Sequence, residues 1–508
     1  MFGGICLGGD DIDDPNDPND PEPVVLEVPS DEFDTIQSAI DAIDTSDPNV
    51  GSATIIVHPG VYTGEGNRDL DFYGKNILLT SDDPNDPEIV STTVINCRAT
   101  MDNPHRAFYF HSEETKATTV DGFTIINGYV IGNGGAIYCN IGNPTIKNCV
   151  ITHNVAWGPD RAGGAIACYN SSPTIINCQI TDNRAAAYGG GISCRDNSNP
   201  LIRNCKITGN TANISGGGIY GWVNSSPQIE RCLITFNESL MYGGGLYFFE
   251  CVQYKPTPPD PNDPGNDPND TGSDPDVDLI PDILINQCTI ANNSVSGGTG
   301  GGIFCSDSVA SLSNSIVWDN LAPKPIGSAI ALSENAVKDT KLTVSYCDVQ
   351  GDQDGQYVLG ANAVLEWLDG NIDEDPNFAD AQNGDYHLMS SAGRWIGKND
   401  EGLDLFFLDD GGNFDASDDI NSPCIDAGDP GLPIGDEHYY NGDVINQGFY
   451  GGTSQASLSY STPTGTGFCT QKIPGDVNED CYVDLKDLAL MAQSWLECNL
   501  LPRYNCWQ

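Results

Sequence analysis

A repeat with a period near 27 residues constrains the fold of this chain more than any other feature. A cysteine recurs in the middle of the chain at intervals of 27 or 29 residues and once, across an insertion, at an interval of 56, and an isoleucine follows it two positions later. An asparagine lies five positions after each cysteine, and a glycine cluster comes next. The repeated dipeptides are Asn148-Cys149, Asn177-Cys178, Asn204-Cys205, Arg231-Cys232 and Gln287-Cys288. A fixed period of this length predicts stacked structural units, because one such unit cannot bury its apolar face alone.

Short β-rich runs separated by turn residues fill each repeat, without helical periodicity. In the pattern I-x-N-C-x-I, the isoleucines and the cysteine are expected to point inward. The asparagine before the cysteine is expected at a bend, where it tolerates a left-handed φ and bonds its equivalent one coil away. Parallel strands in successive coils then satisfy the backbone groups. The fold class predicted is all-β, a right-handed parallel β-helix solenoid.

The beginning of this region carries a resemblance to a known fold family. Residues 33–43, FDTIQSAIDAI, predict a short amphipathic helix that plugs the N-terminal end of the solenoid. Residues 54–62, TIIVHPGVY, follow it. The pattern T-I-Q-x-A-I followed by V-x-P-G-x-Y is similar to the opening of many extracellular β-helix proteins, and the fold resembles that of pectate lyases. The resemblance covers about residues 31–350. It implies the fold but no particular function, since this fold carries lyases, hydrolases, adhesins and stalks alike.

The cysteines of the repeat fall into two expected inward columns. One contains Cys149, Cys178, Cys205, Cys232 and Cys288, and the other contains Cys139, Cys168, Cys194 and Cys305. Stacked strands lie close enough for disulfides, so either disulfides or buried thiols that act as small apolar groups fit the pattern. Four cysteines near the C-terminus lie in a segment with a small core, where disulfides are expected.

An aromatic stripe is predicted on the outward side of the same strands. The residues that alternate with the inward isoleucine and cysteine include Tyr138, Tyr169, Tyr220, Trp222, Tyr247, Phe249 and Phe304. Flat rings on consecutive coils suit the apolar faces of sugars, which makes these residues the candidate substrate-binding set. The alternative is that the Asp-Pro-Asn insertion at about 252–282, or a C-terminal segment, covers the stripe.

Candidate catalytic residues are few. His153 and Asp182 share the same offset from their cysteines, so they are expected on adjacent coils. A surface pair of this kind is more often an incidental contact than a catalytic site. The motifs of the polygalacturonase family are absent from the sequence, and the enzyme interpretation therefore has no positive support.

The C-terminal part departs from the repeat. Residues 351–460 are interpreted as the last coils and a cap, which residues 446–452 would close, and residues 461–474 as a linker. Residues 475–508 resemble a single dockerin calcium loop followed by a helix, with Cys481 at the position where glycine is usual. Hard calcium ions need oxygen ligands at this spacing. The expected ligands are Asp476, Asn478, Asp480, the carbonyl of Tyr482, Asp484 and Asp487.

The charge balance excludes several classes of partner. The chain has a formal net charge of −51, so neither a nucleic acid nor an anionic membrane surface is expected to bind it. No apolar stretch is long enough for a membrane span. Residues 1–30 are interpreted as an acidic Asp-Pro-Asn linker, in which proline and self-repelling aspartates favour extended chain.

These features lead to three functional hypotheses. The first is a secreted or surface-attached, non-catalytic β-helix that binds extracellular glycan or matrix through its outward strand face. In this hypothesis the calcium-binding tail docks to a cohesin-like or surface-anchoring protein. The second is a polysaccharide lyase or glycoside hydrolase acting on an acidic or a plant or algal polysaccharide. The third is a structural surface stalk.

Overall fold

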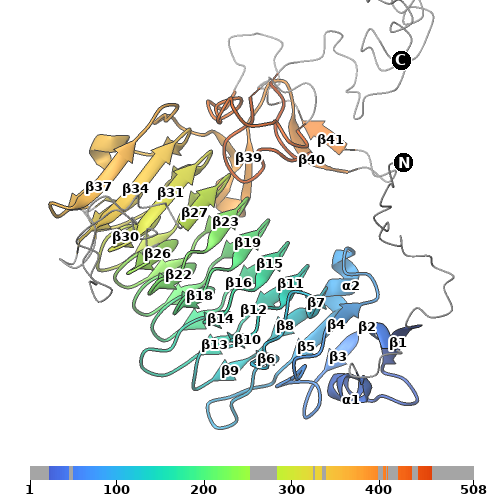
Figure 1. Ribbon diagram of the computed structural model, residues 1–508. Helices are drawn as coiled ribbons and strands as arrows, with labels where there is room; N and C mark the ends of the chain where they lie inside the picture. The colour runs from blue at the N-terminus through green and yellow to red at the C-terminus, as the bar shows by residue number, and fades with distance from the viewer. Residues whose placement is uncertain are drawn as a thin grey trace, which may run out of the picture. The chain divides into compact units, whose positions relative to one another are not determined.

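A computed structural model describes residues 22–44, 50–251, 283–323, 327–334, 339–398, 404–407, 409, 421–437 and 444–459. The chain forms two compact units. Unit 1 comprises Met1–Leu201 and Asn210–Asn213, and unit 2 comprises Ile202–Gly209 and Ile214–Gln508. Both units are coils of short parallel strands with few helices (Figure 1).

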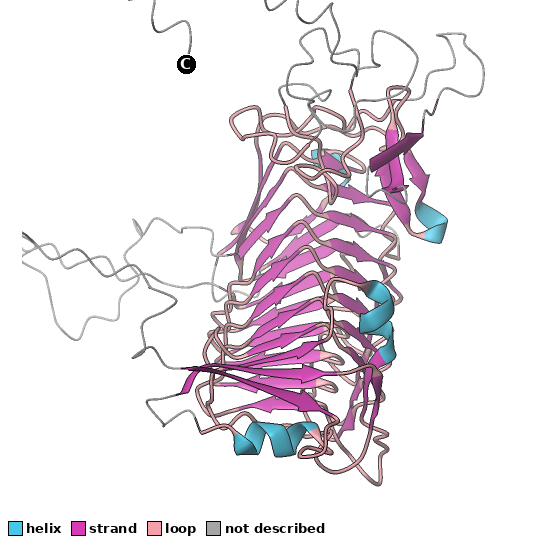
Figure 2. Ribbon diagram, turned by 90° about the vertical axis from the view of Figure 1, so that its right-hand side faces the viewer, coloured by secondary structure: helices cyan, strands magenta, loops and turns pink. Residues whose placement is uncertain are grey.

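Two turns of unit 1 show how the repeat folds. The first consists of β10 (Ile137–Asn140), β11 (Thr145–Lys147), β12 (Val150–Thr152) and β13 (Val155–Ala156). The next consists of β14 (Ile166–Tyr169), β15 (Thr174–Ile176), β16 (Gln179–Thr181) and β17 (Arg184–Ala185). Each strand pairs in parallel with its equivalent one turn later, for example Cys139 opposite Cys168. The strands therefore lie one above another (Figure 2) and build four faces. We call these face A (β11, β15), face B (β12, β16), face C (β10, β14) and face D (β13, β17).

The other strands of unit 1 extend these faces. Face A also contains β1 (Glu22–Val28), β2 (Val50–Val57), β4 (Ile77–Ser81) and β7 (Thr119–Asp121), and face B contains β3 (Gly60–Tyr62), β5 (Thr93–Asn96) and β8 (Thr124–Ile126). Face C contains β6 (Phe108–Phe110) and β18 (Ile192–Arg195), and face D contains β9 (Tyr129–Val130) and β21 (Thr211–Ala212).

Unit 2 has the same four faces. Face A is built by β23 (Gln228–Glu230), β27 (Ile283–Asn286), β31 (Val309–Ser313), β34 (Thr340–Ser345) and β37 (Ala363–Trp367), and face B by β20 (Lys206–Thr208), β24 (Leu233–Thr235), β28 (Thr289–Ala291), β32 (Ile316–Trp318) and β35 (Asp348–Val349). Face C is built by β22 (Ile219–Trp222), β26 (Leu246–Phe249), β30 (Ile303–Ser306), β33 (Ile330–Ser333) and β36 (Tyr357–Leu359), and face D by β25 (Glu238–Ser239) and β29 (Ser294–Val295). The strand β19 (Leu201–Arg203) contains the boundary between the units.

The N-terminal end of unit 1 carries the predicted helix. The helix α1 (Ile36–Ala42) begins at Thr35, whose hydroxyl accepts from the backbone N–H of Ser38 in a capping box. It buries Ile36, Ala39 and Ile40, which explains the apolar spacing seen in the sequence. A second helix, α2 (Pro87–Thr92), has Asp86 as its N-cap and follows the short Asp-Pro-Asn run after β4.

The solenoid begins earlier than the sequence predicted. The predicted acidic linker extended to residue 30, but residues 22–28 form β1, which pairs in parallel with β2. The alternation in Val25-Leu26-Glu27-Val28, with Val28 buried and Val25 and Glu27 exposed, is the period-2 pattern of a strand. The linker prediction is therefore wrong for this segment.

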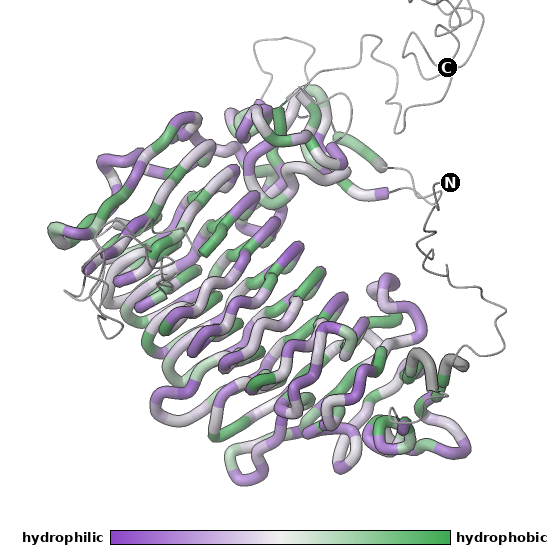
Figure 3. The backbone as a smooth tube through the Cα atoms, viewed as in Figure 1, coloured by the Kyte–Doolittle hydropathy of each residue, from purple (hydrophilic) through white to green (hydrophobic). Residues whose placement is uncertain are grey.

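Isoleucine and cysteine fill the core of both units as predicted, and apolar and polar residues alternate along the strands (Figure 3). Ile151 and Ile180 lie opposite each other and are fully buried. In the described part of the chain the cysteines are buried thiols and not disulfides. Burial raises the pKa of the Cys149 thiol well above its usual value, so this group stays protonated and packs as a small apolar side chain.

A buried asparagine ladder fixes the corner between faces B and D. In unit 1 the Oδ1 atom of Asn183 accepts from both the backbone N–H and Nδ2 of Asn154, each at 3.0 Å. Asn183 makes the same two bonds to Asn210. In unit 2, Asn237, Asn293 and Asn320 form an equivalent ladder. The asparagines that precede the cysteines, such as Asn148 and Asn177, have the predicted positive φ and bond each other at the surface.

The glycine clusters make the next corner possible. Gly243 has a φ of 58°, which a side chain disfavours. A Cβ atom on the following Gly244 would lie 2.5 Å from the carbonyl oxygen of Gly301 and 2.6 Å from the backbone nitrogen of Ser294. Adjacent turns approach too closely there for any residue but glycine.

The C-terminal part of unit 2 covers face B. Its hairpins are β38 (Phe378–Asp380) with β39 (Asp385–Leu388) and β40 (Arg394–Lys398) with β41 (Asp404–Phe407), and the short helices are η1 (Gln353–Gly355) and η2 (Ala381–Asn383). Tyr386 and Tyr450 pack on Leu233 and Ala291. The backbone N–H of Phe449 donates to Oγ1 of Thr289 at 3.0 Å.

This packing corrects the predicted position of residues 446–452. The sequence predicted that they close the C-terminal cap, and the structure places them against the side of face B. The reason is the outward column of that face, in which Leu233, Thr289, Ile316 and Asp348 follow one another in register. All four are buried, and Cys424 packs with Ile316. The apolar members of this column need a cover to leave water.

Candidate functional site

Two outward columns of side chains run along face C of unit 2. Register places Tyr220, Tyr247, Phe304, Ala331 and Tyr357 in one column, and Trp222, Phe249, Ser306, Ser333 and Leu359 in the other. The predicted stripe residues of this unit therefore share one face, as the alternation with buried isoleucine and cysteine required. Sugar binding by this face is not tested by the fold and stays a prediction.

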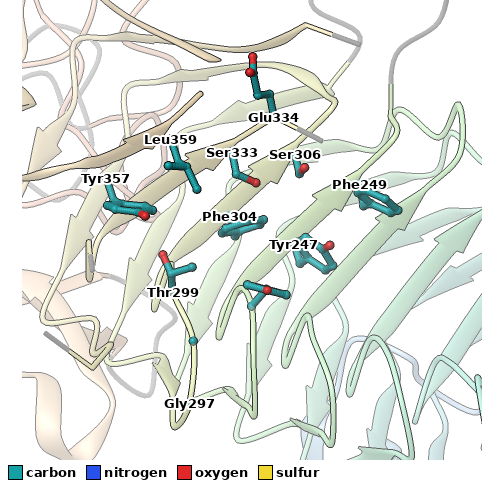
Figure 4. A pocket seen from close by; sticks show the side chains of 12 residues that line it. Tyr247, Phe249, Gly297, Thr299, Phe304, Ser306, Ser333, Glu334, Tyr357 and Leu359 are labelled. Atoms are coloured by element: carbon teal, nitrogen blue, oxygen red, sulfur yellow. The ribbon is translucent and has the colours of Figure 1, made fainter. Parts of the chain in front are cut away.

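A groove of about 560 Å³ lies on this face (Figure 4). Three predicted residues, Tyr247, Phe249 and Phe304, line it. The remaining lining residues are Tyr242, Gly297, Gly298, Thr299, Ser306, Ser333, Glu334, Tyr357 and Leu359. The lining residues come from β26, β30, β33 and β36, from the turns that precede β26 and β30, and from Glu334, which directly follows β33.

The sequence explains why a hollow forms at this place. Ala331 and Ser333 on β33, together with Ser306 on β30, are small residues between bulkier side chains on either side. Strands are about 4.8 Å apart, so the three steps from Phe249 to Leu359 span roughly 14 Å. Small side chains between two bulky rows leave a depression between the rows.

The rings around the groove pack on one another at open angles. The ring centroids of Tyr242 and Phe304 are 4.8 Å apart. Those of Tyr247 and Phe304 are 5.2 Å apart, with an angle of 58° between the ring planes. Tyr247 is 8% exposed and Phe304 is 3% exposed, so these rings form the floor of the groove. Phe249 and Tyr357 are more exposed and form its sides. Among the described residues, the predicted aromatic stripe is thus partly exposed to solvent and partly buried.

The two remaining stripe residues of unit 2 lie outside the groove lining. Tyr220 is 3% exposed, and its ring lies 5.5 Å from that of Tyr247. Trp222 follows two positions later on β22 and is partly buried. Both support the groove from the neighbouring strand.

Unit 1 presents a different arrangement on its face C. The ring of Tyr138 stacks on that of Tyr109 at 5.4 Å with only 4° between the planes, and the guanidinium of Arg106 lies over both rings. The stacked rings and the guanidinium thus cover part of each other's surface. Tyr169 is 41% exposed. Neither Tyr138 nor Tyr169 is among the residues that line the groove of unit 2.

The weak catalytic candidates lie on another face. Register places His153 and Asp182 directly after the paired residues Thr152 and Thr181, on adjacent turns as predicted. Both have positive φ angles near 55° and occupy a tight bend. Nδ1 of His153 lies 2.8 Å from Oγ1 of Thr152. Neither residue lines the groove, and the arrangement gives no chemical role to the pair.

Tyr242 and Tyr357 are groove residues that the sequence reasoning missed. Tyr242 directly precedes the glycine cluster, at a position that pairs with Ser215 and Thr299 in neighbouring turns. The recurrence of that position before each glycine cluster was a usable signal. Tyr357 lies beyond the regular period, and only its pairing with Ala331 reveals it.

The predicted calcium ligands Asp476, Asn478, Asp480, Tyr482, Asp484 and Asp487 lie outside the described residues, and so does the insertion at 252–282. Within the described segments, histidine, cysteine and acidic side chains form no group suited to a metal ion. No helix among those segments is long and apolar enough to cross a membrane.

A family model agrees with the fold of part of this chain. Residues 106–253 match a family model described as a right handed beta helix region, and residues 285–428 match a model described as disaggregatase related. The crystal structure of pectate lyase Pel9A aligns with 84% of this chain and 95% of its own, at 14% identity and a TM-score of 0.39. No curated protein matches the sequence significantly. The chain is thus an all-β protein whose residues 106–253 form a region of right-handed parallel β-helix.

Proposed function

We propose that this protein is an extracellular or cell-surface, non-catalytic β-helix that binds a polysaccharide in the groove on face C of unit 2. The groove itself carries the proposal, because it joins aromatic rings with hydroxyl groups in a depression long enough for several sugar units. Rings cover the apolar faces of sugars, while neighbouring polar groups fix their hydroxyls. The groove residues from 297 to 359 also fall in the part that matches the disaggregatase related model, which supports a role outside the cell.

Binding is expected to depend on the exposed rings of the groove. The first step is a glycan array with the full chain, followed by calorimetric titration of the best oligosaccharide. Phe249→Ala and Tyr357→Ala should each weaken binding about 10-fold, because each removes a ring that contacts the ligand. Both rings are partly exposed, so the variants are expected to keep the fold, which circular dichroism and the thermal midpoint will show.

The matched control is Tyr169→Ala, which removes an exposed ring of unit 1 and should leave the affinity within about 2-fold. The bound polysaccharide is expected to be recovered without new reducing ends or unsaturated products. Equal losses in all three variants would contradict the groove assignment, and the appearance of products would contradict the non-catalytic role.

We further propose that the C-terminal module at 475–508 binds calcium and attaches the protein to a cohesin-like or surface-anchoring partner. Its oxygen ligands from Asp476 to Asp487 have the spacing that calcium requires. Titration of the full chain with calcium chloride should show a saturable site that the double variant Asp476→Ala/Asp487→Ala loses. The control Asp260→Ala/Asp263→Ala removes the same charge from the Asp-Pro-Asn insertion and should keep the site. A heat of calcium binding that persists in Asp476→Ala/Asp487→Ala would refute the assignment of these ligands.

A further inference from the structure

The chemical character of the groove lining bears on which polysaccharide it accepts. We propose that the groove selects an uncharged polysaccharide and rejects one that carries a carboxylate on each sugar. This inference rests on the proposed glycan binding and adds the class of ligand.

Hydroxyl groups form one side of the groove. Ser306 and Ser333 lie opposite each other on the paired strands β30 and β33, in the column that continues from Phe249 to Leu359. A hydroxyl both donates and accepts, as the hydroxyls of a neutral sugar do. Because this column crosses the strands, a bound chain would lie along the stack of turns, with the serine hydroxyls beside it (Figure 4).

Thr299 adds a hydroxyl that the described protein atoms leave unused. The residue is only 7% exposed and lines the groove, and its buried Oγ1 atom has no hydrogen-bond partner among the described residues. A buried hydroxyl without a partner destabilises the folded protein. A sugar hydroxyl in the groove would supply the missing partner and offset part of that destabilisation.

The charge on the lining disfavours an acidic sugar. Glu334 lies at the edge of the groove, and its Oε2 atom accepts from the backbone N–H of Asn362 at 2.5 Å. The other described lining residues are aromatic, aliphatic or small, and the phenols of Tyr242, Tyr247 and Tyr357 are their ionisable groups. A uronate carboxylate in the groove would lose hydrating water and lie near the like charge of Glu334. The net charge of the chain, −51, adds to this repulsion.

The test compares neutral oligosaccharides with their own acidic forms. The full chain is titrated with gluco-, manno- and galacto-oligosaccharides and with the same oligosaccharides oxidised to uronates at C6. At least one neutral oligosaccharide should bind 10-fold or more tightly than its oxidised form, and its affinity should change little between low and high salt. Thr299→Val should weaken neutral binding about 5-fold or more, since it removes the hydroxyl but keeps the shape.

Charge variants separate a local effect from the overall charge. Glu334→Gln should narrow the preference for the neutral form several-fold, whereas Glu238→Gln on face D removes the same charge away from the groove and should leave the preference unchanged. Tighter binding of the oxidised form, with calcium or with a chelator, would overturn the inference and leave the proposed glycan binding intact. Failure of every oligosaccharide to bind would overturn the proposed function and the inference with it.

Discussion

Replacing Asn183 with alanine is expected to lower the free energy of unfolding by about 4 kcal/mol. The side chain is 1% exposed, and its Oδ1 atom accepts the backbone N–H of Asn154. Its Nδ2 atom donates to the carbonyl oxygens of Ile151 and Thr181, each at 2.9 Å. Alanine removes these hydrogen bonds from buried backbone groups of two neighbouring turns, and each lost bond of this kind costs about 1–3 kcal/mol. Urea unfolding followed by circular dichroism measures the loss.

Two further variants show whether hydrogen bonding is the cause. Asn183→Asp keeps the shape but removes the donor and buries a charge, so it should destabilise at least as much as alanine. Asn213→Ala removes an asparagine whose side chain accepts from Arg184 at the surface, and it should change stability by less than about 1 kcal/mol. Equal urea midpoints for Asn183→Ala and Asn213→Ala would contradict a stabilising role of the asparagine ladder.

Stability is expected to fall by about 4 kcal/mol between pH 4 and pH 8 because of Asp348 alone. Burial under the C-terminal cover raises the pKa of this carboxyl from 3.8 to about 7. The hydrogen bonds from Cys424 Sγ to Oδ2 at 3.1 Å and from the backbone N–H of Glu374 to Oδ1 at 3.3 Å oppose the rise without cancelling it. The charges of Asp373 and Glu374 add to the rise.

The sign follows from proton binding in the two states. Between pH 4 and pH 7 the folded protein holds the Asp348 proton that the unfolded chain has released. Raising the pH through this window therefore favours unfolding, and the penalty is complete above pH 7. The stabilising contribution of the protonated carboxyl is fully present below about pH 4.

The variant Asp348→Asn isolates this effect. It stays neutral at every pH, so its stability relative to the original protein should rise by up to about 4 kcal/mol from pH 4 to pH 8. Asp369→Asn, at an exposed site of unit 2, is the matched control and should show a much smaller change. Urea midpoints at several pH values measure both, and a difference between Asp348→Asn and the original protein that does not vary with pH would contradict the role of Asp348.

The sequence predicts the coil well because the coil is local and periodic. The spacing of Cys149, Cys178 and their equivalents places the strands, the inward residues and the bends with positive φ. The boundary at β1 was missed because the acidic low-complexity composition before residue 22 obscures the short alternation around Leu26. The position of residues 446–452 was missed because their partners lie more than 100 positions away, as with Phe449 and Thr289.

The site was predicted only in part for a related reason. Alternation places Tyr247, Phe249 and Phe304 on one face, and the structure confirms their common face. The groove, however, depends on the small residues Ala331 and Ser333 and on Tyr357, which lie where the period becomes irregular. The sequence contains one signal that a segment covers face B. The residue directly after the repeated cysteine is polar at Gln179 and Lys206 but apolar at Leu233.

The location of bound polysaccharide is the most direct test of the account. Hydroxyl-radical footprinting of the full chain, with and without a saturating oligosaccharide from the array, reports which rings the ligand covers. Binding in the groove should protect Phe249 and Tyr357, while the labelling of the exposed Tyr169 in unit 1 should stay unchanged. Protection of Tyr169 with unchanged labelling at Phe249 and Tyr357 would contradict the account.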